Sequence, residues 1–500
     1  MQDSDPDTDT GIPHGEGKGI DRQRRRLMAL AAAGSLGLAG CIGGGDDPDD
    51  TDDDTDANGD DGGDADVDID PDQEGLTLLG LRSLDDEDPI DSGSVGAVYN
   101  HLLEQFEEET GIPVDYDSIS IEDYRTQGLT IMGSGSAPDL FESMQGLASM
   151  GQFAESGYAM AIQDLVDDWV LESRDATGWT YEDGQMLGVG TGDDVYGVPN
   201  QMSGFPLWYS VPVLEDAGID HEEIRHSRDV TWDEFNDMCE QIRDAGYDPL
   251  AMGNRVGGHI PYLVHAAFIK SVDYDDIVAM VRGDNDMRLD DEVFVEAFEL
   301  IEEWWDNEYI NQDTLSLDED EAESLIFTQD AAFMTDGIWI EYLYFVAADP
   351  EEMGPLGEGW DYMWWPYRPD AYPEGRNQIY GHVNGAWSMS PLADERGKSD
   401  EAKQFLEFWA DVEQEEFRSE HGNLLPAHEG VTDAFFNEVS ASMYNTVADP
   451  ETTQTTIRID ELLPPEVGTD LIETGQELFT GQMSAREVLE NVQETWDNLD

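Results

Sequence analysis

Cys41 carries the plainest chemical signal of the chain, because it ends a Leu-Ala-Gly-Cys sequence that resembles a lipobox. A lipobox cysteine becomes the first residue of the mature chain and carries lipid. The apolar run 27–39 before it is too short to span a bilayer, which takes about 20 residues. Arg24 and Arg25 precede that run. We therefore predict that residues 1–40 are a twin-arginine lipoprotein signal peptide, with an ordinary signal peptide and an incidental cysteine as the alternative.

An acidic stretch of low complexity follows Cys41. Residues 42–75 contain 16 acidic residues and no basic residue. A segment of this composition cannot bury a core and stays extended. We predict that residues 41–75 form a disordered tether between a lipid anchor and a folded body. Because a single lipid chain anchors a protein only marginally, a second chain or a membrane partner is expected.

The common motifs of catalytic and metal sites do not occur. The chain contains neither Gly-x-Ser-x-Gly nor His-Glu-x-x-His. Lys398 lies between a glycine and a serine, but the upstream glycine of a phosphate-binding loop is missing. The alternating aspartates at 64–70 lack the glycine and the distal glutamate of a calcium loop. We therefore predict no catalytic residue, no metal site and no cofactor.

The charge of the body limits its partners and its environment. The chain has a formal net charge of −92, from 23 basic and 115 acidic residues. Without the leader and the tether, residues 76–500 keep 18 basic and 93 acidic residues, a net charge of −75. Such self-repulsion destabilises a compact state unless molar salt shortens the Debye length to ~3 Å. The lysine-poor composition resembles that of extreme halophiles, and it excludes nucleic acid, which needs a basic surface.

Aromatic content and length indicate a globular body. Thirteen tryptophans and 10% aromatic residues distinguish the chain from a disordered acidic protein. The length of the segment 76–500 predicts two or three domains. If Cys41 is lipidated, Cys239 has no partner for a disulfide within the mature chain. No second apolar segment is long enough for a membrane helix.

The first part of the body alternates between strand and helix patterns. The apolar run 76–81 predicts a strand, and the helical spacing of 95–110 ends at a glycine. Residues 112–116 return to a strand, so the order is strand, helix, strand, which implies a parallel sheet. The other predicted elements are strands 139–141 and 207–210, and helices 121–132, 232–245, 258–270, 291–306, 319–327, 399–420, 468–480 and 484–498.

The order of these segments resembles the extracellular solute-binding proteins of ABC importers, in particular the sugar-binding group related to maltodextrin-binding protein. Each matching piece is weak alone, but six in the order and spacing of the family make a strong signal. The resemblance spans nearly all of residues 76–500, and its pieces are 106–114, 136–141, 194–199 with 207–210, 230–235, 330–339, and 399–409 with 422–426 and 481–484.

The resemblance implies an α/β fold of two lobes, of the type II periplasmic-binding-protein kind, with the ligand in a cleft between lobes joined by hinge strands. Open α/β sheets bind ligands beyond the carboxyl ends of their strands, which agrees with such a cleft. By resemblance, lobe one comprises residues 76–202 and 363–397. Lobe two comprises 203–362 and 398–500. The protein would then be a monomeric, haloarchaeal, lipid-anchored binder of a small polar solute, most simply a sugar, working with an ABC permease.

Several polar and aromatic residues are candidates for ligand contacts in this cleft. In lobe one, Ser83 follows the first strand, and a second group follows the strand that ends at Phe141. The alternative is helix capping for Ser83, a structural histidine for His382, and ordinary loop polarity for Glu142, Ser143, Gln145 and Gln201. The lobe-one candidates are Ser83, Glu142, Ser143, Gln145, Gln201, His382 and Asn384.

In lobe two, Asn254 follows a predicted strand, and Trp339 matches a family tryptophan that stacks on a sugar ring. A flat aromatic face complements the apolar C–H face of a sugar. Trp365, beside Trp364 at the second crossover, competes for that role, and Trp339 could instead be a core residue. The sequence does not distinguish these possibilities.

Two other functions stay open at this point. Paired carboxylates could serve an extracellular carbohydrate-active enzyme, although 115 acidic residues produce such pairs by chance. A structural protein of the cell surface is the other alternative, which the lack of repeats and of Asn-x-Ser/Thr sequons disfavours. We expect a binding protein at the outer face of the cell membrane.

Overall fold

The computed structural model describes residues 73–92, 94–174, 180–182, 185–186, 194–255, 257–340 and 359–499. All of them belong to one compact unit, Gly63–Asp500. The predicted signal peptide, the lipidated Cys41 and most of the tether lie outside the described residues. No helix in the described part of the chain is long and apolar enough to cross a membrane.

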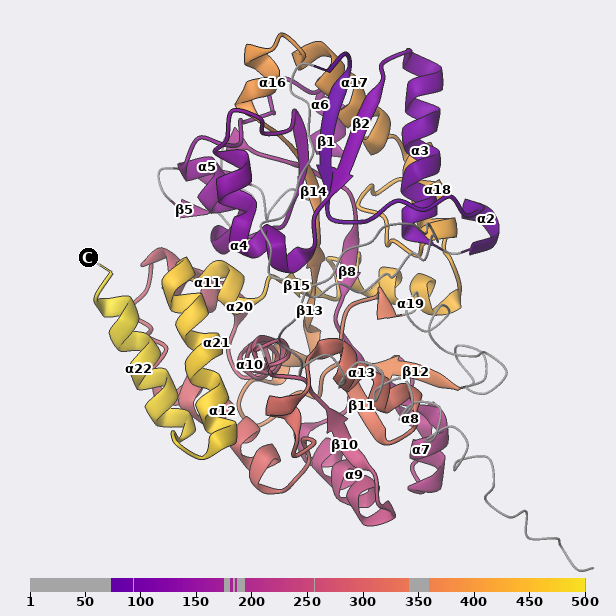
Figure 1. Ribbon diagram of the computed structural model, residues 1–500. Helices are drawn as coiled ribbons and strands as arrows, with labels where there is room; N and C mark the ends of the chain where they lie inside the picture. The colour runs from indigo at the N-terminus through magenta and orange to yellow at the C-terminus, as the bar shows by residue number, and fades with distance from the viewer. Residues whose placement is uncertain are drawn as a thin grey trace, which may run out of the picture. The chain divides into compact units, whose positions relative to one another are not determined.

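The first sheet has the order β2-β1-β3-β14-β7 (Figure 1). Its central strands are parallel, β1 with β2 and with β3, whereas β14 runs antiparallel to both β3 and β7. The predicted strand–helix–strand unit is therefore present. The strands are β1 (Leu76–Gly80), β2 (Val114–Ser118), β3 (Leu140–Ser143), β7 (Val198–Pro199) and β14 (Ala386–Met389).

Helices on this sheet begin and end where local signals predict. Ser94 caps the first helix through the backbone N–H of Ala97, and Gly111 ends it in the left-handed region at φ 72°. The helices and turns of this part are α2 (Pro89–Ser92), α3 (Val95–Thr110), α4 (Ile121–Met132), η1 (Leu147–Gly151), α5 (Gln152–Glu155), α6 (Asp168–Glu172) and α16 (Pro391–Glu395).

The predicted helix 399–420 is two helices, α17 (Ser399–Ala410) and α18 (Val412–Gly422). Asp411 adopts an extended backbone between them, and its side chain accepts a hydrogen bond from the N–H of Glu413. Both helices contribute to the core of the first sheet, with Trp409 buried among residues of β1 and β14. The sequence analysis assigned 398–500 to lobe two, and the packing of α17 and α18 differs from that assignment.

A buried ion pair helps to fix α18 beside the first sheet. Arg174 donates to Glu415 at 2.8 Å and to the carbonyl oxygen of Pro199 at 2.9 Å, and both side chains are fully buried. Glu415 also accepts from the backbone N–H groups of Ala427 and His428, each at 2.8 Å. These contacts connect residues far apart in the sequence, so no local sequence pattern predicts which lobe α18 packs against.

The second sheet has the order β10-β11-β9-β12. β10 and β11 are parallel, and β9 runs antiparallel to both β11 and β12. Its side chains and the surrounding helices form the largest hydrophobic core of the described chain. The strands are β9 (Leu207–Ser210), β10 (Asp248–Ala251), β11 (Ala331–Thr335) and β12 (Trp360–Met363).

The helices around the second sheet carry clear N-terminal signals. Thr231 and Glu234 form a capping box at the start of α9, and Gly246 ends that helix at φ 98°. These elements are α7 (Val211–Asp216), α8 (His221–Ile224), α9 (Trp232–Ala245), α10 (Ile260–Ile269), α11 (Tyr274–Arg282), α12 (Glu292–Asp306), η3 (Thr314–Ser316), α13 (Glu319–Phe327), α20 (Ile459–Leu462), α21 (Pro465–Thr480) and α22 (Ala485–Asp497).

A third sheet, β15-β13-β8, lies where the chain passes between the two larger sheets (Figure 1). β13 pairs antiparallel with β8 and parallel with β15. This sheet occupies the position expected for hinge strands. Its strands are β8 (Met202–Gly204), β13 (Gln378–Val383) and β15 (Gln454–Thr456), flanked by η4 (Pro373–Asn377) and α19 (Glu438–Val447); a small sheet contains β4 (Thr180–Glu182), β5 (Gln185–Met186) and β6 (Asp194–Val195).

Candidate binding cleft

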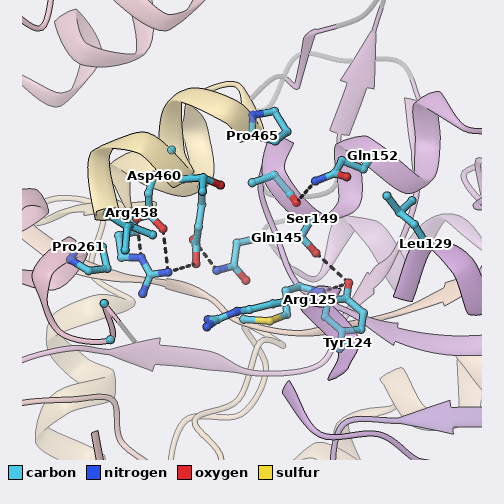
Figure 2. A pocket seen from close by; sticks show the side chains of 18 of the residues that line it. Tyr124, Arg125, Leu129, Gln145, Ser149, Gln152, Pro261, Arg458, Asp460 and Pro465 are labelled. Carbon is cyan, nitrogen blue, oxygen red and sulfur yellow. Dashed lines mark hydrogen bonds and ion pairs between the residues drawn. The ribbon is translucent and has the colours of Figure 1, made fainter. Parts of the chain in front are cut away.

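A cavity of about 330 Å³ lies between elements of the two larger sheets (Figure 2). One wall comes from α4, from the segment after β3, and from η1 and α5. The other wall comes from the start of α10, from the start of α13, and from α20 and α21. The segment after β3 begins at a carboxyl end of the first sheet, where open α/β sheets bind ligands.

Tyr124 organises the first wall. Its hydroxyl accepts a hydrogen bond from the backbone N–H of Met144 at 3.1 Å and bonds the hydroxyl of Ser149 at 2.8 Å. Burial raises the pKa of Tyr124 to about 12, so the phenol stays neutral and able to donate. These two bonds hold the turn that presents Gln145 to the cavity.

Gln145 joins the two walls. Its Nε2 donates to Oε2 of Glu461 at 2.7 Å, and the side chain is 2% exposed. Its Oε1 is buried and has no hydrogen-bond partner among the residues that the structure describes. A buried acceptor without a donor is costly, so this atom is suited to a ligand hydroxyl or N–H group.

Gly146 allows the walls to touch. Its backbone has φ 93° and ψ 168°, a region that only glycine adopts without strain. A Cβ placed there would lie 2.6 Å from the carbonyl oxygen of Glu461 and 2.9 Å from its Cβ. The approach of the two walls therefore depends on the missing side chain at this position.

Arg458 is the charged centre of the second wall. It binds Asp460 through two hydrogen bonds, of 2.7 and 2.9 Å, and lies 3.4 Å from Oε1 of Glu461. Its guanidinium also lies over the ring of Tyr262, 4.9 Å from the ring centre. Burial raises the pKa of Glu461, and the Arg458 charge counteracts that rise.

Arg125 extends from α4 across the cavity towards the wall that carries Arg458 (Figure 2). It makes no hydrogen bond or ion pair with any residue in the described part of the chain. Burial raises the pKa of Glu461 and of Tyr262, and the positive charge of Arg125 counteracts both rises. The cavity thus contains a guanidinium whose donors are free for a ligand.

Of the ten predicted ligand contacts, Gln145 lines this cavity. Glu142 lies behind the first wall, where its two oxygens accept from the N–H of Leu81 at 2.7 Å, the hydroxyl of Tyr99 at 2.9 Å and the amide of Asn200 at 3.1 Å. Ser143 is buried, 2.7 Å from the hydroxyl of Ser388.

Three further candidates lie in the first lobe, Ser83 in the loop after β1, and Gln201 and Asn384 near the crossovers. Ser83 is exposed, with its hydroxyl 3.4 Å from that of Ser118. Gln201 accepts from Arg82 at 3.4 Å, and its carbonyl oxygen accepts from the backbone N–H of Asn384 at 2.9 Å. The structure brings Gln201 and Asn384 together, but away from the residues that line the cavity.

The aromatic candidates surround Phe205. Trp339 is half-buried and meets the Phe205 ring edge-on, at 5.3 Å between ring centres. Trp365 is 1% exposed and donates its indole N–H to the Phe205 carbonyl oxygen at 3.0 Å. Asn254 is fully buried and donates to the hydroxyl of Thr314 at 2.8 Å. Their roles in ligand binding stay predictions.

His382 lines a second hollow, of about 920 Å³, along the hinge sheet and α19. Burial lowers the pKa of His382 to about 4, so the imidazole is neutral at ordinary pH. None of the residues that line this hollow comes from α4 or η1, so the hollow does not face both walls of the cleft. We therefore take the smaller cavity as the candidate cleft.

The lining residues that the sequence analysis did not identify include Tyr124, Arg125, Glu319, Arg458 and Glu461. The sequence could have pointed to Arg125 and Arg458, because basic residues are rare in the segment 76–500. Arg125 lies in the second turn of a predicted helix, and Arg458 lies two residues before an Asp-Glu pair. No group of three His, Cys, Asp or Glu residues that could hold a metal ion occurs in the described part.

Comparison with known proteins supports the architecture. The family model described as bacterial extracellular solute-binding protein matches residues 91–416. Similar solved structures include a chitin oligosaccharide binding protein, with 21% identity over 85% of this chain and 98% of the other and a TM-score of 0.68. No curated protein sequence matches the chain.

Two more solved structures share the fold. The GacH receptor of Streptomyces glaucescens, solved unliganded and with acarbose, is 16% identical over 85% of this chain and 99% of the other, with a TM-score of 0.64. The maltose-bound MalE3 of T. maritima is 15% identical over 85% and 100%, with a TM-score of 0.62. The chain therefore has the two-lobe α/β fold of these proteins, as the sequence predicted.

Proposed function

The chain belongs to the family of bacterial extracellular solute-binding proteins, and we propose that it captures a small polar solute between its lobes and delivers it to an ABC permease. The observation that carries the proposal is the cavity whose two walls meet in the Gln145–Glu461 hydrogen bond. Hinge closure around a ligand is the established motion of such binding proteins. The solute would leave the cleft chemically unchanged, because the role is binding and not catalysis.

We propose a sugar or a short oligosaccharide as the ligand. The cavity presents donors and acceptors together with the apolar side chains Leu129 and Ile472, which suits a molecule with hydroxyl groups and C–H faces. Its volume of about 330 Å³ lies at the small end of ligand pockets, which favours one or two sugar rings. The similar structures with acarbose and maltose support the same class.

We further propose that the mature protein is a monomer at the outer face of the membrane of a halophile. A lipid on Cys41 would anchor it after twin-arginine export, and residues 42–75 would act as the tether. The support for this is the sequence pattern and the body charge of −75.

A screen of neutral and acidic mono- and oligosaccharides by thermal shift in molar potassium chloride tests the proposal. A bound ligand raises the melting temperature by mass action. Calorimetry then gives the affinity of each hit, and chromatography of the recovered sugar tests for conversion. Turnover of the sugar would support the enzyme instead, and the lack of any shift would contradict sugar binding.

A further inference from the structure

Arg125 is an exposed residue at the rim of the cavity, and it has no ion pair with any described residue although the chain is rich in carboxylates. Residues 76–500 contain 18 basic and 93 acidic residues, so partners are abundant. Other arginines and lysines of the structure use them, as Arg288 does with Asp290 and Asp497, at 2.8 and 2.9 Å. Arg125 has no hydrogen bond or ion pair with any described residue, although it lies in a cavity with three acidic side chains.

Two of these three carboxylates are already engaged. Asp460 holds the guanidinium of Arg458 through both of its oxygens. Glu461 accepts from Gln145 and lies 3.4 Å from Arg458. Asp460 and Glu461 therefore have other partners and form no ion pair with Arg125.

The remaining polar groups of the cavity define what a ligand must offer. Oε1 of Gln145 is a buried acceptor that needs a donor. Glu319 lines the opposite wall and likewise has no hydrogen-bond partner within the described residues. A ligand that satisfies both must carry hydroxyl or N–H groups, whereas Arg125 requires an acceptor.

We propose that the ligand is an acidic sugar, a uronate or aldonate, whose carboxylate is bound by Arg125 while its hydroxyls meet Gln145 and Glu319. This inference rests on the proposed function, since it concerns the same cleft. A planar guanidinium matches a carboxylate with two parallel hydrogen bonds, which a neutral hydroxyl cannot reproduce. A cavity with one unpaired arginine and the carboxylate of Glu319 on the opposite wall favours a monoanion over a phosphate dianion.

In molar salt, recognition of the ligand carboxylate depends on short-range contacts. In molar salt the Debye length is ~3 Å, so the net charge of the body neither repels nor steers a distant anion. Only hydrogen bonds at contact distance then distinguish an acidic from a neutral sugar. The discrimination should therefore reside in Arg125 itself and persist at molar salt.

The test compares galacturonate, glucuronate and gluconate with galactose, glucose and glucose 6-phosphate, by calorimetry on the full chain in molar potassium chloride. Arg125→Gln removes the charge, and Arg125→Lys keeps the charge but loses the bidentate geometry. Arg486→Gln is the matched control, because Arg486 lies on α22, forms an exposed ion pair with Glu292, and does not line the cavity.

We expect an acidic sugar to bind the wild type more tightly than its neutral counterpart. Loss of hydrogen bonds to a charged group should weaken this binding tenfold to about a hundredfold in Arg125→Gln, less in Arg125→Lys, and not in Arg486→Gln. Binding of neutral sugars or of the phosphate ester in preference to every acidic sugar, or unchanged uronate binding in Arg125→Gln, would overturn the inference and leave the proposed function standing. No binding of any sugar would instead overturn the proposed function.

Discussion

A methyl group at position 146 should hold the cleft open. In Gly146→Ala the new Cβ would lie 2.6 Å from the carbonyl oxygen of Glu461, whereas relaxed C···O contacts are about 3.3 Å or longer. Relief of this overlap requires the two walls to separate by about 0.7 Å. Such a shift stretches the 2.7 Å hydrogen bond between Gln145 and Glu461 to the limit of hydrogen bonding.

The expected loss of affinity follows from that hydrogen bond. A hydrogen bond to a charged group contributes about 1.5–3 kcal/mol. If the ligand binds tightly only to the closed form, its affinity should fall about tenfold to a hundredfold. Calorimetry with the sugar that gives the largest thermal shift measures this directly.

Backbone strain is the competing effect, and a second variant separates it. Alanine at φ 93° and ψ 168° costs of order 1–3 kcal/mol of folding stability, with or without ligand. Gly157 has φ 69° and open space where a Cβ would lie, so Gly157→Ala adds strain of ~1–2 kcal/mol without a collision. Denaturation without ligand should show a loss in both variants, but only Gly146→Ala should bind weakly. Wild-type affinity in Gly146→Ala would refute the steric reasoning.

Four other results are expected. Cys41→Ser should release the protein from the membrane fraction into the medium, as fractionation and blotting would show; continued membrane association contradicts lipidation. Dialysis to ~0.1 M salt should unfold the body, because its charge of −75 is then poorly screened, and circular dichroism would show the loss of structure. A cooperative native fold at ~0.1 M salt would contradict this expectation. Trp339→Ala should bind the hit sugar tenfold to a hundredfold more weakly with little change in apo stability if the ring is a platform, whereas a core ring would cost ~3–5 kcal/mol of stability. Burial lowers the pKa of Lys270 to about 7, below its value in the unfolded chain, so the unfolded state binds more protons than the folded state above pH 7. Denaturant titrations should therefore show stability that rises from pH 7 to 9, and Lys270→Met should flatten that rise.

Local signals were enough to place most helices and strands. The helix after Thr231 begins with a capping box and ends at Gly246, and both signals are visible in the sequence. The break at Asp411 was missed because the apolar spacing continues across it and the residue acts as a cap only in the folded chain. The helical pattern of 399–410 shows that the segment packs on a core, but not on which one.

The cleft was harder to predict because its residues are contributed by segments far apart in the sequence. Gln145 was identified because it follows a strand that ends at the carboxyl edge of the sheet. Arg125 and Arg458 come from a helix and from a connection, and only the tertiary structure brings them to one cavity. Glu142 has the right strand position, but its oxygens are used by Leu81, Tyr99 and Asn200.

The strand order of the first sheet determines when that sheet can be completed during synthesis. β14 lies between β3 and β7, so residues 386–389 must be present before those two strands gain their shared neighbour. About 190 residues separate the end of β7 from the end of β14, which takes the ribosome roughly 10–40 s at 5–20 residues per second. During that interval β3 and β7 each expose an unpaired edge that other strands could join. In molar salt, acidic side chains would discourage such pairing between copies only at contact distance, because charge is screened beyond ~3 Å.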